Sequence, residues 1–172
     1  MIALQGLQGP DGALNRDLIV VLDGGSARLE QAGRYRQQVL QEQPPQGRRL
    51  EPEQLLIRCP RTPPPPPSIT GLPLLQLLEG YDTATQITAL SGWLQRRQGP
   101  PPQRLWIATD PGHTGRAVAL ARIALAGRGI QIQPDPPPPP GPSEHRKLLR
   151  DALRPRSLPA SGPIAGCRPA AS

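Results

Sequence analysis

Aromatic residues are scarce in this chain, whose 172 residues include two Trp, two Tyr and no Phe. Four rings are too few for the stacking platform on which many proteins bind single-stranded nucleic acid. Lysine and asparagine are also rare, because all but one of the 20 basic residues are Arg and Asn occurs once. This excess of Arg is what a GC-rich coding sequence produces, and the Arg residues are dispersed. The net charge of +7 therefore does not by itself indicate a nucleic-acid partner.

The chain also has few cysteines and no long apolar run. Its two cysteines, Cys59 and Cys167, lack the paired spacing of a zinc site, so we expect no bound metal. No stretch approaches the roughly 18 consecutive apolar residues that cross a membrane. Residues 1–12 lack the basic start and apolar core of a signal peptide. We therefore expect a cytoplasmic protein without a membrane span.

Proline and glycine are abundant instead, with 26 and 18 residues respectively. Such a content is typical of low-complexity, disordered chains. Here the proline is concentrated in a few runs, and the apolar segments between them are intact. This arrangement favours a folded domain with proline-rich loops, which lie at 63–67, 99–102 and 136–140.

Short apolar segments alternate along the chain with longer segments of helical periodicity. The expected strands cover 17–22, 54–59, 74–78, 105–108 and 130–133, and the expected helices cover about 27–43, 84–97, 111–125 and 143–153. Strands and helices that alternate build a mostly parallel sheet with helices on its faces. The sequence thus predicts an α/β fold with about five strands, a single Rossmann-like three-layer domain over 16–154. We expect a flexible segment at 1–15 before it and a disordered tail at 155–172 after it.

One strand–helix junction carries the most informative chemistry. The fourth expected strand is followed by Thr109, and Asp110 can cap a helix whose first position is Pro111. His113 and Arg116 are three residues apart, so they share one face of that helix. A helix N-terminus beyond the carboxyl end of a parallel strand is where α/β proteins bind anions. His113 is the candidate general acid or base, since an imidazole titrates near neutral pH. The alternative is an ordinary connection with a solvated His and Arg.

The loops after the other strands meet the same edge of a parallel sheet. Backbone amides, guanidinium groups, hydroxyls and carboxylates together suit an anionic small molecule as the partner. The structural alternatives are a plain tight turn for the glycines, a solvated helix position for Arg28 and an N-cap for the Asp82–Thr83 pair. The candidate ligand-binding residues in these loops are Gly24, Gly25, Arg28, Glu79, Asp82 and Thr83.

Three segments resemble the YdcF/SanA/ElyC-like family, which has a Rossmann-like domain of unsettled activity. They are DLIVVLDGG with Arg28 beyond it, GLPLLQLLEGYDTATQ, and LWIATDPGHTGRAVALARIALAGRGIQI, and the resemblance spans about residues 17–153. The resemblance implies a nucleotide-like, S-adenosylmethionine-like or envelope-precursor ligand, and it leaves open whether the chain is an enzyme. The matching site residues are Gly24, Gly25 and Arg28 in the first loop, Glu79, Asp82 and Thr83 in the third, and Thr109, His113, Arg116 and Ala117 in the fourth.

Two departures from the family's pattern bear on function. The family places Ser-Gly-Gly and a helix after the second strand, where this chain has Arg58-Cys59-Pro60 and a polyproline run. Many relatives also carry N-terminal membrane segments, which this sequence does not show. Two functions stay open. One is binding of a nucleotide-like, S-adenosylmethionine-like or phosphorylated small molecule at the strand carboxyl edge. The other is a non-catalytic role in cell-envelope biogenesis or regulation, or a diverged member without ligand binding.

Overall fold

The computed structural model describes residues 16–22, 25–46, 49–59, 75–80, 82–139 and 141–153. Strands and helices alternate along these residues as the sequence predicts. The strands are β1 (Asp17–Leu22), β2 (Glu53–Ile57), β3 (Leu75–Leu77), β4 (Arg104–Ala108) and β5 (Gln131–Gln133). The helices are α1 (Ser26–Glu42), α2 (Thr83–Arg96), α3 (Pro111–Ala124) and α4 (Pro142–Ala152).

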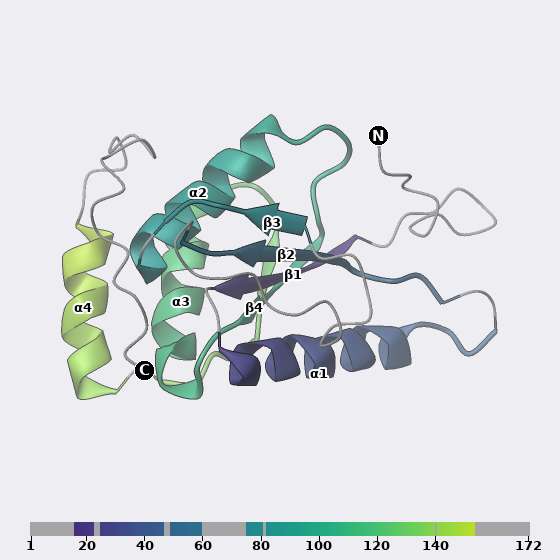
Figure 1. Cartoon of the computed structure of the whole chain (residues 1–172), viewed down its shortest axis with the longest axis horizontal. Coiled ribbons are helices and arrows are strands. Elements are labelled where there is room, and N and C mark those ends of the chain that lie inside the picture. Colours follow the sequence, from purple (N-terminus) through teal and green to yellow (C-terminus); the bar gives the residue numbers. More distant parts are fainter. Residues whose placement is uncertain are drawn as a thin grey trace.

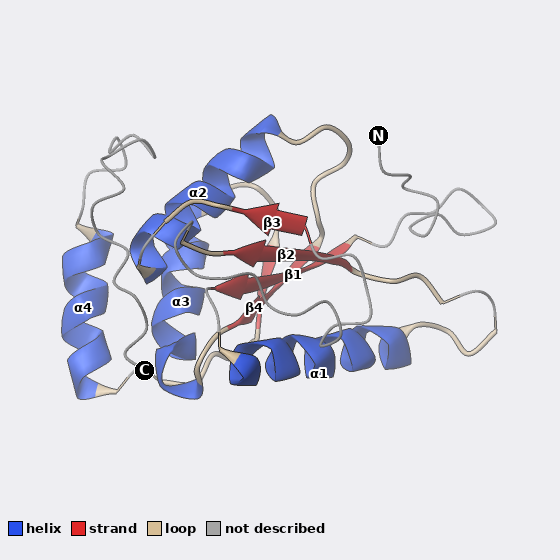
Figure 2. Ribbon diagram, in the orientation of Figure 1, coloured by secondary structure: helices blue, strands red, loops and turns tan. Residues whose placement is uncertain are grey.

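All five strands are parallel and form one sheet in the order β3-β2-β1-β4-β5 (Figure 2). β1 lies at its centre, where Val20 is level with Leu55 of β2 and with Ile107 of β4. Parallel strands covered on both faces consist of continuous apolar runs, and residues 18–22 are all buried. The expected mostly parallel sheet of about five strands is confirmed.

Helices cover both faces of this sheet, which gives three layers (Figure 1). α1 packs on one face, where Leu29 joins a buried cluster with Trp106 of β4. α2 and α3 pack on the other face, with Leu90 and Val118 in the larger of the two cores. α4 lies outside α3 and adds the partly buried Leu148 to that core (Figure 1). The predicted single Rossmann-like three-layer domain is confirmed.

The order of the strands fixes where a ligand site is expected. From β1 the chain adds β2 and β3 on one side of the sheet, and then adds β4 and β5 on the other side. The helices that follow β1 and β4 therefore start side by side but cover opposite faces. In open parallel sheets, ligands bind at such a reversal, beyond the carboxyl ends of the strands. The candidate site thus lies between the ends of β1 and β4, where α1 and α3 begin.

The segment after β2 is where the sequence departs from the Ser-Gly-Gly pattern of the YdcF/SanA/ElyC-like family. Arg58 is buried, and its Nε donates to Gln76 Oε1 on the neighbouring strand at 2.9 Å. Cys59 is buried, as a residue ending an apolar strand is expected to be, and its sulfur is in a disulfide. The expectations for 1–15, for the polyproline run at 63–67 and for 155–172 lie outside the described residues. Within the described part of the chain, no helix has the length and apolar character needed to cross a membrane.

Candidate functional site

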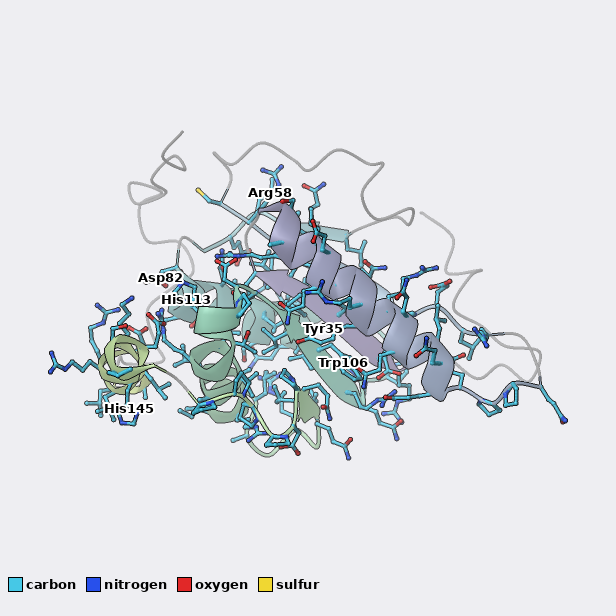
Figure 3. All side chains as sticks on the ribbon, turned by 90° about the horizontal axis from the view of Figure 1, so that it is seen from below. Tyr35, Arg58, Asp82, Trp106, His113 and His145 are labelled. Carbon is cyan, nitrogen blue, oxygen red and sulfur yellow. The ribbon has the colours of Figure 1, made fainter. Side chains whose placement is uncertain are left out.

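The predicted site residues lie at the carboxyl edge of the sheet, but they do not form one cluster. Figure 3 labels His113 at the start of α3 and Asp82 at the start of α2, both on this edge. Gly24 lies outside the described residues. The other candidates separate into three groups. The switch-point group contains Gly25, Arg28 and Thr109, with Asp110 beside them. A second group, His113 and Arg116, faces α4, and a third lies at the start of α2 and contains Glu79, Asp82 and Thr83.

Arg28 joins the two sides of the switch point. It lies in the first turn of α1, and its guanidinium donates to the backbone oxygen of Leu22 at the end of β1. The same guanidinium donates to Asp110 Oδ2 at 2.5 Å, across the gap between α1 and α3. The Arg28 side chain is 20% exposed and that of Asp110 is 44% exposed. Arg28 is therefore placed at the predicted site, and a carboxylate of the protein already contacts it.

The charge of Arg28 changes the acidity of its partner. The hydrogen bond from Arg28 lowers the pKa of Asp110 below the usual 3.8, against the opposing effect of partial burial. The positive charge of Arg28 and that of protonated His113 act in the same direction. Asp110 is consequently an anion at neutral pH.

In the described part of the chain, no side chain caps either of the two helices that start at the switch point. Gly25 is the N-cap of α1 and has no side chain to offer, while its backbone is extended, with φ −77° and ψ 162°. Asp110 is the N-cap of α3, as predicted, but its carboxylate accepts no hydrogen bond from the first turn of that helix. Neither first turn contains an acidic residue. Both helix N-termini therefore present backbone amides and the positive end of the helix dipole toward this edge.

His113 and Arg116 share one face of α3, as their spacing predicts, but this face points toward α4. Arg116 NH1 donates to Glu144 Oε2 at 2.9 Å, and Arg116 NH2 lies 3.3 Å from Asp151 Oδ2. His113 Nδ1 lies 3.0 Å from the same oxygen of Glu144. That contact lacks hydrogen-bond alignment, and among the described residues this nitrogen has no hydrogen-bond partner. The two residues predicted to bind a ligand thus dock α4 onto α3.

Burial distinguishes the roles of these two residues. The Arg116 side chain is 7% exposed and contacts two carboxylates, of which Glu144 is 7% and Asp151 0% exposed. The His113 side chain is 40% exposed and remains open to solvent. Of the pair, only His113 is accessible to a small molecule in this structure.

Glu144 is the residue at the centre of this network that the sequence did not single out. Lys147 Nζ donates to Glu144 Oε1 at 2.6 Å, and this bond is the largest of the effects that lower its pKa from 4.5 to about 2. His113 and Arg116 contribute in the same direction, while burial opposes them. A signal was present in the sequence, since Glu144, Leu148 and Asp151 follow the spacing of one helix face.

The group at the start of α2 maintains local structure. Asp82 Oδ1 accepts from the backbone amide of Thr85 at 2.8 Å, and Thr85 Oγ1 accepts from the amide of Asp82 at 3.0 Å, which forms a capping box. Thr83 is the first residue of the helix. Glu79 precedes it and lies 3.8 Å from Arg96, at the end of α2. The alternative explanation of Asp82–Thr83 as an N-cap is therefore confirmed for Asp82.

A hollow of about 450 Å³ lies elsewhere, beside the edge strand β5 and the C-terminal end of α3. α3 runs back from the carboxyl edge, so its end lies far from the switch point. The lining includes Arg122 and Asp135, which form an exposed ion pair at 2.8 Å. None of the predicted site residues lines it. It therefore gives no support to the predicted site.

Comparison of the chain with family models, with curated proteins and with solved structures finds no match. The resemblance to the YdcF/SanA/ElyC-like family thus stays a prediction from the sequence. Any functional proposal has to be argued from the strand order and from the contacts at the carboxyl edge.

Proposed function

We propose that this chain binds a nucleotide-like, S-adenosylmethionine-like or phosphorylated small molecule through an anionic group of that molecule, at the switch point between β1 and β4. The observation that carries the proposal is the N-terminus of α1. Its N-cap is Gly25, its first turn has no acidic residue, and Arg28 stands one turn away. An anion at this position meets backbone amides, a helix dipole and a guanidinium at once.

The space at this helix end fits the same role. Among the described residues, nothing lies within 4 Å of where a Cβ on Gly25 would be. The contrast with α2 is informative, because the capping box of Asp82 and Thr85 satisfies the amides there. Among the described residues, a side chain therefore caps the helix start away from the switch point, and none caps the one beside β1.

If the protein catalyses a reaction on the bound ligand, we assign the role of general acid or base to His113. Its ring is partly exposed, and Nδ1 lies against Glu144. The Glu144 carboxylate, whose pKa is lowered to about 2, is charged at neutral pH and lies 3.0 Å from this nitrogen.

A second function is favoured by a specific observation. Arg116 is enclosed by Glu144 and Asp151, and Arg58 stands where the family has Ser-Gly-Gly. One expected ligand contact, Arg116, is thus used within the protein, and the backbone amides of Ser-Gly-Gly are replaced by another residue. This favours a non-catalytic member that senses a ligand or has lost it, such as a factor in envelope biogenesis or regulation.

The test is a binding screen with adenosine 5′-monophosphate, S-adenosylmethionine and glucose 6-phosphate, by thermal shift and calorimetry. We expect at least one probe to bind the wild type. Arg28→Met should lower the affinity for that probe by about 10-fold or more, because the variant loses a charge-assisted hydrogen bond. Arg122→Met is the matched control, because it removes an ion-paired Arg at the other end of α3. Absence of binding to every probe, or equal weakening by both variants, overturns the proposal. Binding without turnover of phosphoesters or methyl acceptors favours sensing over catalysis.

A further inference from the structure

Two aspartates hold the N-cap position of a helix in this domain, and they behave differently. Asp82 caps α2, and its Oδ1 accepts from the amide of Thr85. Asp110 holds the same position at α3, yet its Oδ2 contacts Arg28 of another helix at 2.5 Å. Aspartate is among the residues most favoured at N-caps. The interaction with Arg28 therefore replaces a capping bond that this side chain is otherwise suited to form.

The backbone of Asp110 does not prevent capping. Its φ of −59° and ψ of 143° lie in the extended region that N-cap residues adopt. Pro111 occupies the first helical position, and the amides of Gly112 and His113 follow. The amide of His113 now donates to the backbone oxygen of Asp110 at 2.8 Å. A rotation of the Asp110 side chain is enough to bring its carboxylate from Arg28 to this first turn.

We propose that the Asp110 carboxylate is an internal competitor for the anionic group of the ligand. It contacts Arg28 in the free protein, and it turns to cap α3 when a ligand anion takes its place. The proposal rests on the proposed binding at the switch point and names the ligand class more closely. The positive end of the α3 dipole stabilises the released carboxylate, which offsets part of the cost of separating it from Arg28.

This exchange gives the site a preference among anions. A ligand carboxylate replaces one singly charged group at Arg28 by another of the same kind. A phosphate dianion brings more charge and a third oxygen, and it repels Asp110 toward α3. The site therefore selects phosphate esters over carboxylates, and among the proposed ligands it favours a nucleotide-like one. Asp110 is in this sense a specificity-determining residue.

The experiment compares binding of adenosine 5′-monophosphate to the wild type and to Asp110→Asn by calorimetry. Asparagine keeps the capping ability of aspartate but lacks its charge. We expect the variant to bind about 10-fold more tightly. Asp82→Asn is the matched control, because it makes the same change at the other N-cap, and its affinity should stay within about twofold of the wild type. The double variant Asp110→Asn, Arg28→Met should lose the gain.

The outcomes separate this inference from the proposed function. If the wild type binds the nucleotide, Arg28→Met weakens binding and Asp110→Asn leaves it unchanged, the competitor is overturned and the site stands. A gain in affinity that persists in the double variant, or that Asp82→Asn reproduces, is a general charge effect. Such a gain also overturns the role of Asp110 as a competitor. If none of the proteins binds the nucleotide, both proposals fail for this ligand class. Amide hydrogen exchange gives an independent check, since nucleotide binding should increase protection at Gly112 when Asp110 caps α3.

Discussion

Replacement of Glu144 by Gln tests whether the carboxylate between α3 and α4 stabilises the fold. A pKa of about 2 in the folded protein, against 4.5 ordinarily, corresponds to about 3 kcal/mol at 1.36 kcal/mol per pKa unit. This value is an upper limit, because α4 lies on the outside of the molecule and Lys147 is half-exposed, so solvent screens part of the interaction. Arg116 also keeps Asp151 in the variant. We therefore expect Glu144→Gln to lower the free energy of unfolding by about 1–2 kcal/mol at pH 7.

The effect has a defined dependence on pH. A carboxyl whose pKa is lower in the folded state contributes its full stabilisation above its unfolded pKa, here 4.5, and loses it as the pH falls toward about 2. Glutamine resembles the protonated carboxyl at every pH. The difference in unfolding free energy between wild type and Glu144→Gln should therefore be constant above about pH 5 and shrink steadily below it.

Urea unfolding followed by circular dichroism at several pH values measures this difference directly. Glu30→Gln on the exposed surface of α1 is the matched control, and it should change the unfolding free energy by less than about 0.5 kcal/mol at any of these pH values. A loss at pH 7 that does not diminish on acidification would refute the electrostatic explanation. So would a loss no larger than that of the control, because α4 would then be held by packing alone.

Two further predictions concern the turn before α2. Gly80 has φ +82°, and a Cβ there would lie 2.8 Å from the amide nitrogen of Gln86, so Gly80→Ala should lower the unfolding free energy by about 2 kcal/mol or more. Gly33→Ala in α1 is the control, because a Cβ there meets no described atom within 4 Å, and it should raise the unfolding free energy by about 0.5–1 kcal/mol. Thermal unfolding that shows the same effect for Gly80→Ala and Gly33→Ala would contradict the steric explanation. Asp82→Ala should cost about 1 kcal/mol in urea unfolding by removing both bonds of the capping box, whereas an effect below about 0.3 kcal/mol would show that the cap does not matter.

Local features of the fold could be predicted because each depends on neighbouring residues. The run at 18–22 is apolar because it is covered on both faces, and Gly127 and Gly129 end α3 with positive φ values of 78° and 69°. The common face of His113 and Arg116 follows from helical spacing alone. The same reasoning located the cap at Asp82. These predictions required no knowledge of how the helices are rotated relative to one another.

The partners of the charged side chains could not be predicted in this way. Arg28 and Asp110 are 82 residues apart, and Arg116 and Glu144 are 28 apart. Which carboxylate an Arg meets depends on how α1, α3 and α4 are placed around the sheet. Periodicity assigns a residue to a helix face, but the packing decides what that face meets. The predicted site residues therefore lie at the expected edge of the sheet, but carboxylates of the protein contact Arg28 and Arg116, the two cations that the sequence assigned to a ligand.

The carboxylates that the protein supplies decide which of these arginines a ligand can use. An anion that binds Arg116 has to separate it from Glu144 and Asp151, which are covered on all described sides and lie on a helix held by the same contacts. Separating such a buried pair leaves charged groups without their partners, which costs more than one phosphate contact returns. An anion that binds Arg28 in place of Asp110 displaces a carboxylate that is half-exposed and has the first turn of α3 as an alternative partner. The lower cost of displacement selects Arg28, and with it the α1 side of the switch point, although His113 and Arg116 carry the more recognisable motif.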